Sequence, residues 1–124
     1  MIDDRRKIGL EAERAVRRHL EQKGYVHRES NWRRGHGELD LVMMDGDELV
    51  FVEVKARRSE TAGRAEEGVS KKQARMLLRT GEMYSLIHPD VEGKIWRIDL
   101  VGITLSPGGD ILDLVHYENA IVVG

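Results

Sequence analysis

The segment from Gly37 to Arg57, GELDLVMMDGDELVFVEVKAR, constrains the fold more than any other part of the sequence. Residues 38–44 and 49–55 are rich in Leu, Val and Phe and are predicted to be strands. The polar DGDE between them is predicted to be a hairpin turn. The second strand, LVFVEVK, is apolar on both faces as far as Glu53, which is typical of a central strand that is buried on both sides.

Four charged residues lie inside these apolar runs: Glu38, Asp40, Glu53 and Lys55. Burying a charge is costly unless the charge is paired or binds a metal. Because side chains alternate along a strand, each strand contributes two of these residues to one face. A two-residue or four-residue turn centred on residues 46–47 places Asp40 opposite Glu53, and Lys55 opposite Glu38. A two-residue turn at residues 45–46 instead shifts the register by two residues but still keeps the four charged side chains on one face. A three-residue loop would place the two pairs on opposite faces, unless a bulge brought them back to the same face.

Two acidic side chains at opposite positions predict a cation site. Their Cβ atoms would lie about 4.5–5.5 Å apart, and the carboxylates repel each other unless one is protonated or a cation lies between them. The sequence contains no cysteine, so a metal would be bound by carboxylates, His or carbonyls, which favours Mg²⁺ or Mn²⁺. A metal beside a lysine suits phosphodiester hydrolysis, because the metal activates water and the lysine neutralises charge in the transition state. A solvated cross-strand ion pair is the alternative.

The first helix is predicted over residues 4–23, with Gly24 ending it. Glu13 lies at the edge of its apolar stripe, so its carboxylate can point along the core boundary. A second helix is predicted to begin near Ser70, where SKKQ offers a capping box between Ser70 and Gln73.

The remaining segments complete an α/β pattern. Strands are predicted at 25–30, at 94–105 and from 111 onward, and loops at 31–37 (NWRRGHG) and 56–68 (ARRSETAGRAEEG). The order helix, strands, helix, strands indicates one α/β domain over residues 1–124, with a mixed β-sheet flanked by helices.

Charge is arranged in blocks that suit a nucleic-acid partner. The overall charge is −2, but residues 1–36 carry +4, residues 37–54 carry −6 and residues 55–79 carry +5. The two basic blocks flank the acidic block, which suits an acidic metal site with basic residues on both sides that face a phosphate backbone. The alternative is a solvated surface of mixed charge. Seven basic residues in the predicted loops or at the start of the second helix are candidates for phosphate contacts. They are Arg33, Arg34, Arg57, Arg58, Arg64, Lys71 and Lys72.

The sequence also sets expectations for location and assembly. No apolar run approaches the ~20 residues of a membrane span, and the N-terminus has no signal-peptide core, so we expect a cytoplasmic protein with no membrane partner. A homodimer is expected because one small domain has little surface with which to grip a duplex.

Several motifs together resemble one family. GELDLV, LVFVEVKAR and RIDLV resemble the YraN-like family of small bacterial endonuclease-like proteins, and GLEAERAVRRHLEQKGY, NWRRGHGELD and HYENA extend the resemblance over nearly the whole chain. Asp40, Glu53 and Lys55 match the PD-(D/E)xK nuclease signature. The resemblance implies a restriction-endonuclease-like core in which Asp40 and Glu53 bind metal and Lys55 is catalytic. Glu13 would be a further acidic group at the metal site, and Glu38 matches the family's Gly-Glu-x-Asp motif.

The resemblance is incomplete in the first helix, where Ala12 and Val16 replace the usual Gly and Ala. The leading hypothesis is an Mg²⁺- or Mn²⁺-dependent nuclease acting on nucleic acid, with DNA as the expected substrate. The alternative is a non-catalytic nucleic-acid-binding or assembly module that retains the nuclease fold. A carboxylate-pair hydrolase such as a glycosidase is disfavoured by Lys55 and by the scarcity of aromatic residues that could stack on sugars.

Overall fold

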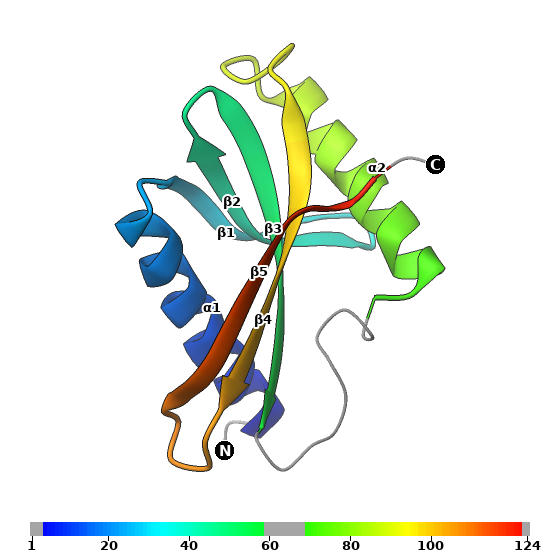
Figure 1. Ribbon diagram of the computed structural model, residues 1–124. Coiled ribbons are helices and arrows are strands. Elements are labelled where there is room, and N and C mark those ends of the chain that lie inside the picture. The colour runs from blue at the N-terminus through cyan, green and yellow to red at the C-terminus, as the bar shows by residue number, and fades with distance from the viewer. Residues whose placement is uncertain (1–3, 59–68, 123–124) are drawn as a thin grey trace.

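The computed structural model describes residues 4–58 and 69–122 (Figure 1). Its elements are, in chain order, α1 (Asp4–Gln22), β1 (Val26–Arg34), β2 (Gly37–Asp45), β3 (Glu48–Arg58), α2 (Lys71–Ile87), β4 (Trp96–Leu105) and β5 (Ile111–Ile121). Within the described residues the strands form one five-stranded sheet in the order β1-β2-β3-β4-β5. Strands β3 and β4 are parallel, and the other neighbours are antiparallel. The predicted α/β class with a mixed sheet is confirmed, and the arrangement is consistent with a restriction-endonuclease-like core.

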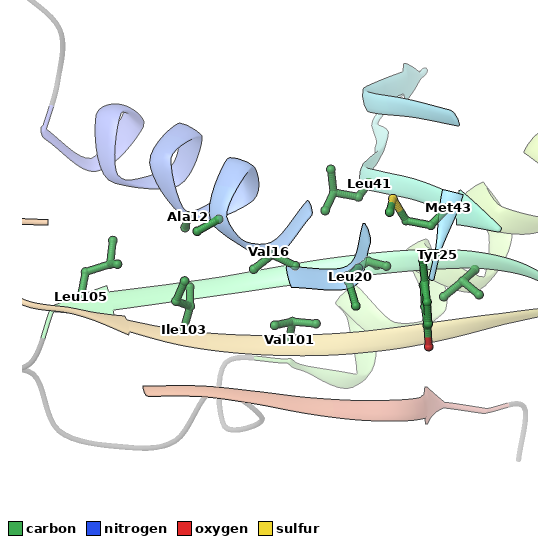
Figure 2. Packing of buried hydrophobic residues seen from close by; sticks show 12 residues of the cluster. Ala12, Val16, Leu20, Tyr25, Leu41, Met43, Val101, Ile103 and Leu105 are labelled. Carbon is green, nitrogen blue, oxygen red and sulfur yellow. The ribbon is translucent and has the colours of Figure 1, made fainter. Parts of the chain in front are cut away.

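Helix α1 covers one face of the sheet, and α2 lies on the other (Figure 1). Figure 2 shows Ala12, Val16 and Leu20 of α1 against the strands, including Val101 of β4. These three helix residues are fully buried, as the apolar stripe in the sequence predicted. The helix ends where predicted, because Gly24 adopts a φ of +97° that few other residues tolerate.

Helix α2 packs against the opposite face through Leu77, Gly81 and Tyr84. A Cβ atom at Gly81 would lie 2.8 Å from the ring of Phe51, so glycine lets helix and sheet approach closely. Ser70 caps the helix by accepting a hydrogen bond from the backbone N–H of residue 73, at 3.1 Å. Neither α1 nor α2, over the described residues, has a stretch that is both long and apolar enough to span a membrane.

The β2–β3 hairpin selects one of the registers that the sequence left open. Asp45 pairs with Glu48, so residues 46 and 47 form a two-residue turn, and Gly46 has a φ of +60°. Backbone pairing continues to Leu41 and Val52. The next positions along the two strands are Asp40 and Glu53, as that register predicted.

The two predicted loops are partly wrong. NWRRGHG is not a loop throughout, because β1 continues to Arg34 and pairs with β2 as far as Gly37. The side chains of this segment are polar because β1 is an edge strand. The segment is extended because its backbone pairs with β2, and not because its side chains favour a strand. The loop predicted at 56–68 begins later, because β3 continues to Arg58 beside β4. Residues 59–68, including Arg64, lie outside the described residues.

Candidate active site

The structure brings Asp40, Glu53 and Lys55 together at the place where the β2–β3 ladder ends. The Asp40 and Glu53 carboxyl groups share a hydrogen bond. Nζ of Lys55 lies 3.4 Å from Oε2 of Glu53, and the Glu53 side chain is 8% exposed. Asp40 is further fixed by the backbone, because its Oδ2 accepts a hydrogen bond from the N–H of Val54 at 2.9 Å.

The electrostatics of this pair follow from its burial. The pKa of Glu53 is raised from 4.5 to about 8, first by burial and then by the hydrogen bond with Asp40 and the negative charge of Asp40. The positive charge of Lys55 acts in the opposite direction but is outweighed. Glu53 therefore binds a proton more readily than an ordinary glutamate does. A cation beside the two carboxyl groups would neutralise the same excess negative charge.

Gln73 of α2 joins the cluster, and the sequence did not reveal it. Its Nε2 donates to Oε2 of Glu53 at 2.5 Å, and its Oε1 accepts a hydrogen bond from Nζ of Lys55 at 3.3 Å. The capping-box prediction is therefore half correct. Ser70 caps the Gln73 backbone, but the Gln73 side chain reaches the sheet instead of turning back to Ser70. A buried carboxyl group and an ammonium offer stronger hydrogen bonds than a neutral backbone donor.

Glu13 approaches the same cluster from α1. Its pKa is raised to about 7, first by burial, then by the negative charge of Asp40, with a smaller effect from Glu38. A hydrogen bond with the Asn31 side chain opposes this rise. Glu13 thus lies within the electrostatic range of Asp40, as its position at the edge of the apolar stripe suggested.

The described acidic side chains do not gather into a cluster of three. Among the described residues, no group of three acidic, imidazole or thiol side chains lies together in a way that could hold a metal ion. Three protein ligands are not required by Mg²⁺, which commonly keeps several waters and takes one or two carboxylates together with substrate phosphates. The hydrogen-bonded pair of Asp40 and Glu53 has the oxygen donors and the excess negative charge that such an ion needs.

Two hollows border the part of β3 that contains Glu53 and Lys55. One, of about 360 Å³, lies toward α2 and is lined by Asp40, Glu53, Gln73 and Lys72, among others. The other, of about 500 Å³, lies toward α1 and is lined in part by Glu13, Lys55 and Arg57. The cluster therefore borders two solvent-accessible hollows. Each is lined by a basic residue that the sequence predicted to contact phosphate, Lys72 in the first and Arg57 in the second.

The other residues that the sequence singled out as possible phosphate or metal contacts have varied positions. Arg33 is exposed and pairs with Glu38 at 3.4 Å, so Glu38 contacts a nearby arginine, which was one of its two expected kinds of partner, the other being Lys55. Arg34 and Lys71 are exposed, at the end of β1 and the start of α2. His36 lines the 360 Å³ hollow. Arg58 donates to the carbonyl of residue 107 at 3.4 Å.

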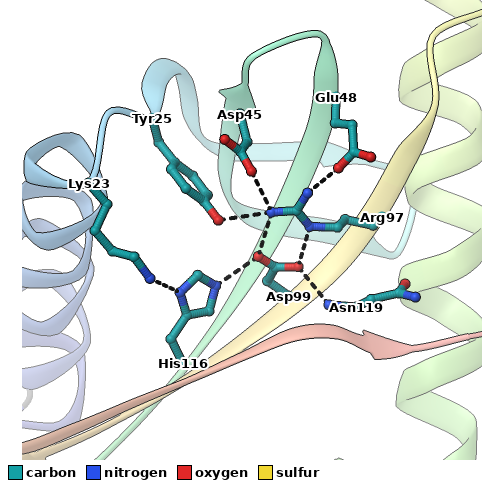
Figure 3. A network of polar contacts seen from close by, with 8 residues as sticks. All are labelled: Lys23, Tyr25, Asp45, Glu48, Arg97, Asp99, His116 and Asn119. Atoms are coloured by element: carbon teal, nitrogen blue, oxygen red, sulfur yellow. Dashed lines mark hydrogen bonds and ion pairs between the residues drawn. The ribbon is translucent and has the colours of Figure 1, made fainter.

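A separate polar network lies on the α1 face of the sheet and has a structural role (Figure 3). Asp99 is fully buried and accepts hydrogen bonds from Arg97 at 3.0 Å, His116 at 2.8 Å and the backbone N–H of Asn119 at 2.9 Å. Burial alone would raise the pKa of Asp99, but the bonds from His116 and Arg97 outweigh burial and lower it. Arg97 also bonds Tyr25, so the network ties β4 and β5 to the segment after α1.

Comparison with known proteins places the chain in a family. The profile of the Uncharacterised protein family UPF0102 matches residues 12–103. A UPF0102 protein of Pelotomaculum thermopropionicum is 38% identical over 121 residues, which cover 97% of this chain and 99% of that protein. A UPF0102 protein of Kineococcus radiotolerans is 42% identical over 103 residues, covering 82% and 84%. A UPF0102 protein of Chloroflexus aurantiacus is 34% identical over 121 residues, covering 98% of each. The chain therefore belongs to the UPF0102 family, the YraN-like group that its motifs resemble.

Proposed function

We propose that this protein is an Mg²⁺- or Mn²⁺-dependent nuclease that hydrolyses phosphodiester bonds of nucleic acid, with DNA as the expected substrate. The observation that carries the proposal is the contact of two carboxyl groups and an ammonium group at the place where the pairing of β2 with β3 ends. Asp40 and Glu53 share a hydrogen bond, and Nζ of Lys55 lies 3.4 Å from Glu53. Two acids and an amine in contact beside open hollows suit a charged substrate, whereas a purely structural ion pair needs only one acid.

Asp40 and Glu53 would hold the metal ion, and Glu13 would support it from α1. When bound, the ion supplies Lewis acidity and a water of lowered pKa. Both carboxyl groups would hold the ion in their ionised form, in which they only accept hydrogen bonds. The N–H of Val54 would keep Asp40 in place, because it already donates to one of the Asp40 oxygens.

Lys55 would act on the phosphate itself. Its ammonium can donate to a phosphoryl oxygen and stabilise the negative charge that develops in the transition state. Gln73 accepts a hydrogen bond from Lys55 and donates one to Glu53, so it fixes the distance between amine and acid. Arg57 and Lys72, one in each hollow, would contact neighbouring phosphates and add a salt-dependent component to binding.

One observation favours a second candidate function. Among the described residues, no group of three acidic, imidazole or thiol side chains could hold a metal ion, and a nucleic-acid-binding or assembly module that retained the fold would need none. That module would bind DNA in a salt-dependent manner and leave it intact with Mn²⁺ present.

The test is nicking of supercoiled plasmid, followed by a panel of linear, flapped, four-way and single-stranded substrates. Wild-type protein should cleave only with Mg²⁺ or Mn²⁺, and Lys55→Ala should lower the rate about 10²–10³-fold. Lys94→Ala is the matched control, because Lys94 forms a surface ion pair with Asp47 at 3.6 Å, far along the chain from the cluster. Cleavage at equal rates by wild type and Lys55→Ala would refute the assignment. DNA binding without cleavage of any substrate would establish the second candidate instead.

A further inference from the structure

Strand β3 has an open backbone edge in the part of the chain that the structure describes. Strand β2 pairs with β3 only as far as Val52, whereas β3 continues beside β4 to Arg58. The N–H of Val54 faces the open side, because it donates to the Asp40 carboxylate at 2.9 Å. Backbone groups alternate along a strand, so the N–H and C=O of Ala56 face the same side. No described residue pairs with Ala56 there, which leaves a donor and an acceptor for a ligand.

The hollow on the α1 side borders this edge. Its volume of about 500 Å³ lies within the range of sites that bind small organic groups. Its apolar lining residues are Ile8, Val54 and Ala56, and two basic residues, Lys55 and Arg57, also line it. Apolar walls with a few polar groups are typical of a site for an organic ligand, and the basic groups favour a ligand that carries negative charge.

Gly9 leaves space at the α1 wall of this hollow. It lies within α1, where glycine destabilises a helix relative to alanine, and it does not adopt a positive φ. A Cβ atom at Gly9 would have no described atom within 4 Å, so packing among the described residues does not require glycine there. Because Gly9 lines the hollow, a larger side chain at this position would occupy it.

We propose that this hollow binds one unpaired base of a nucleic-acid strand. The apolar residues contact the face of the base, the backbone of Ala56 bonds its edge, and Lys55 and Arg57 contact the adjoining phosphates. In a duplex the edge of a base is paired and its faces are stacked, so the ligand is a single strand or an unpaired nucleotide. The inference rests on the proposed function in one respect, since the bound strand would be the substrate of the adjacent Asp40 and Glu53.

An extended peptide is the other occupant that a strand edge can take, because it adds its own backbone hydrogen bonds to the sheet. The composition of the hollow favours the nucleotide. Lys55 and Arg57 carry positive charges that a neutral peptide backbone does not use, whereas each nucleotide brings a phosphate together with its base.

The experiment is fluorescence anisotropy with two labelled strands, an oligodeoxythymidine and an abasic strand with the same number of phosphates, both in the presence of a chelator. Because the two strands carry the same charge, the ratio of their affinities reports contacts made by the bases. Wild type should prefer the oligodeoxythymidine about 10-fold. Gly9→Leu should lower this ratio to about one and leave the affinity for the abasic strand unchanged.

Two controls separate loss of the hollow from loss of the fold. Gly9→Leu should unfold at a temperature no lower than that of wild type, because it replaces a helix glycine whose Cβ would meet no described atom. Gln22→Leu adds the same side chain at an exposed position at the other end of α1, and it should keep the preference of wild type.

Three outcomes would overturn the inference. Equal affinity of wild type for the two strands would leave a peptide as the remaining occupant of the edge. A preference for bases that persists in Gly9→Leu would place the base outside this hollow. An equal loss of affinity for both strands in Gly9→Leu would assign the hollow to phosphate. Plasmid nicking with Mn²⁺ is measured separately, so absence of nicking with the base preference intact refutes the nuclease and not the base site.

Discussion

Replacing Asp40 by asparagine should stabilise the metal-free protein at alkaline pH, although Asp40 belongs to the proposed site. In the wild type, Asp40 and Glu53 are in hydrogen-bond contact and Glu53 is 7% exposed, so ionising both places two like charges together with little solvent between them. Asparagine removes one of these charges. Its side-chain oxygen can still accept the hydrogen bond from the N–H of Val54.

The size of the effect follows from the pKa of Glu53, which is raised from 4.5 to about 8. At about 1.36 kcal/mol for each pKa unit, this rise corresponds to about 5 kcal/mol. Burial is the largest cause, and burial remains in the variant. We therefore assign the smaller share, about 1–2 kcal/mol, to the hydrogen bond with Asp40 and its charge.

The sign of the pH dependence is fixed by the direction of the shift. A carboxyl group whose pKa is higher in the folded protein than in the unfolded chain contributes stability that is fully present below the unfolded value of 4.5. That contribution is lost as pH rises through the folded value of about 8. Metal-free wild type should therefore lose stability between about pH 5 and about pH 9. Asp40→Asn should lose less, so the advantage of the variant should grow with pH.

The assay is urea denaturation in the presence of a chelator at several pH values, repeated with Mn²⁺. Mn²⁺ at 100 times its dissociation constant should stabilise wild type by about 2.7 kcal/mol and should have little effect on Asp40→Asn. Asp47→Asn is the control, because the Asp47 side chain is fully exposed in the hairpin turn. If Asp40→Asn is less stable than wild type at about pH 9 without metal, repulsion between the two carboxyl groups does not destabilise the wild type.

Three further predictions concern the stability of the fold around the candidate site, and each can be measured by urea denaturation. Arg97→Met should lower the free energy of unfolding by about 3–5 kcal/mol, because it leaves the fully buried Asp99 without its charged partner; a loss below about 1 kcal/mol would contradict this role. Gly81→Ala should cost about 1–3 kcal/mol, since the new Cβ would lie 2.8 Å from the Phe51 ring, and an unchanged midpoint would show that α2 moves away freely. Ser70→Ala should cost about 1 kcal/mol through loss of the α2 cap, and stability equal to wild type would mean that solvent replaces the cap.

The sequence predicted the hairpin but left its register open. The apolar runs defined both strands, and the structure shows the two-residue turn in which Gly46 has a positive φ. Because side chains alternate with a period of two, this turn set the relation between Asp40 and Glu53. Lys55 then followed from its spacing of two residues from Glu53. These relations are local, so a single stretch of sequence contains them.

The features that the sequence did not reveal depend on contacts between distant segments. The side chain of Gln73 could either complete a capping box or form a hydrogen bond with a carboxyl group on the sheet. Only the packing of α2 on the sheet determines that it contacts Glu53. Asn31 lies in a polar segment that reads as a loop, yet it is part of a strand because β2 pairs with β1 on both sides of it. Its positive φ has no sequence signal beyond the tolerance of asparagine for that region.

The position of the site follows from a requirement of the backbone. Pairing between β2 and β3 ends at Leu41 and Val52, so the next N–H groups of β3 need other acceptors. The Asp40 side chain meets that need by accepting from Val54, and in doing so it takes the place of a main-chain carbonyl. An acid held by the backbone in this way cannot turn away from Glu53 when the two repel each other. In the proposed metal site, the separation of the strands would provide the space for a cation, and the fixed Asp40 carboxylate would favour its binding.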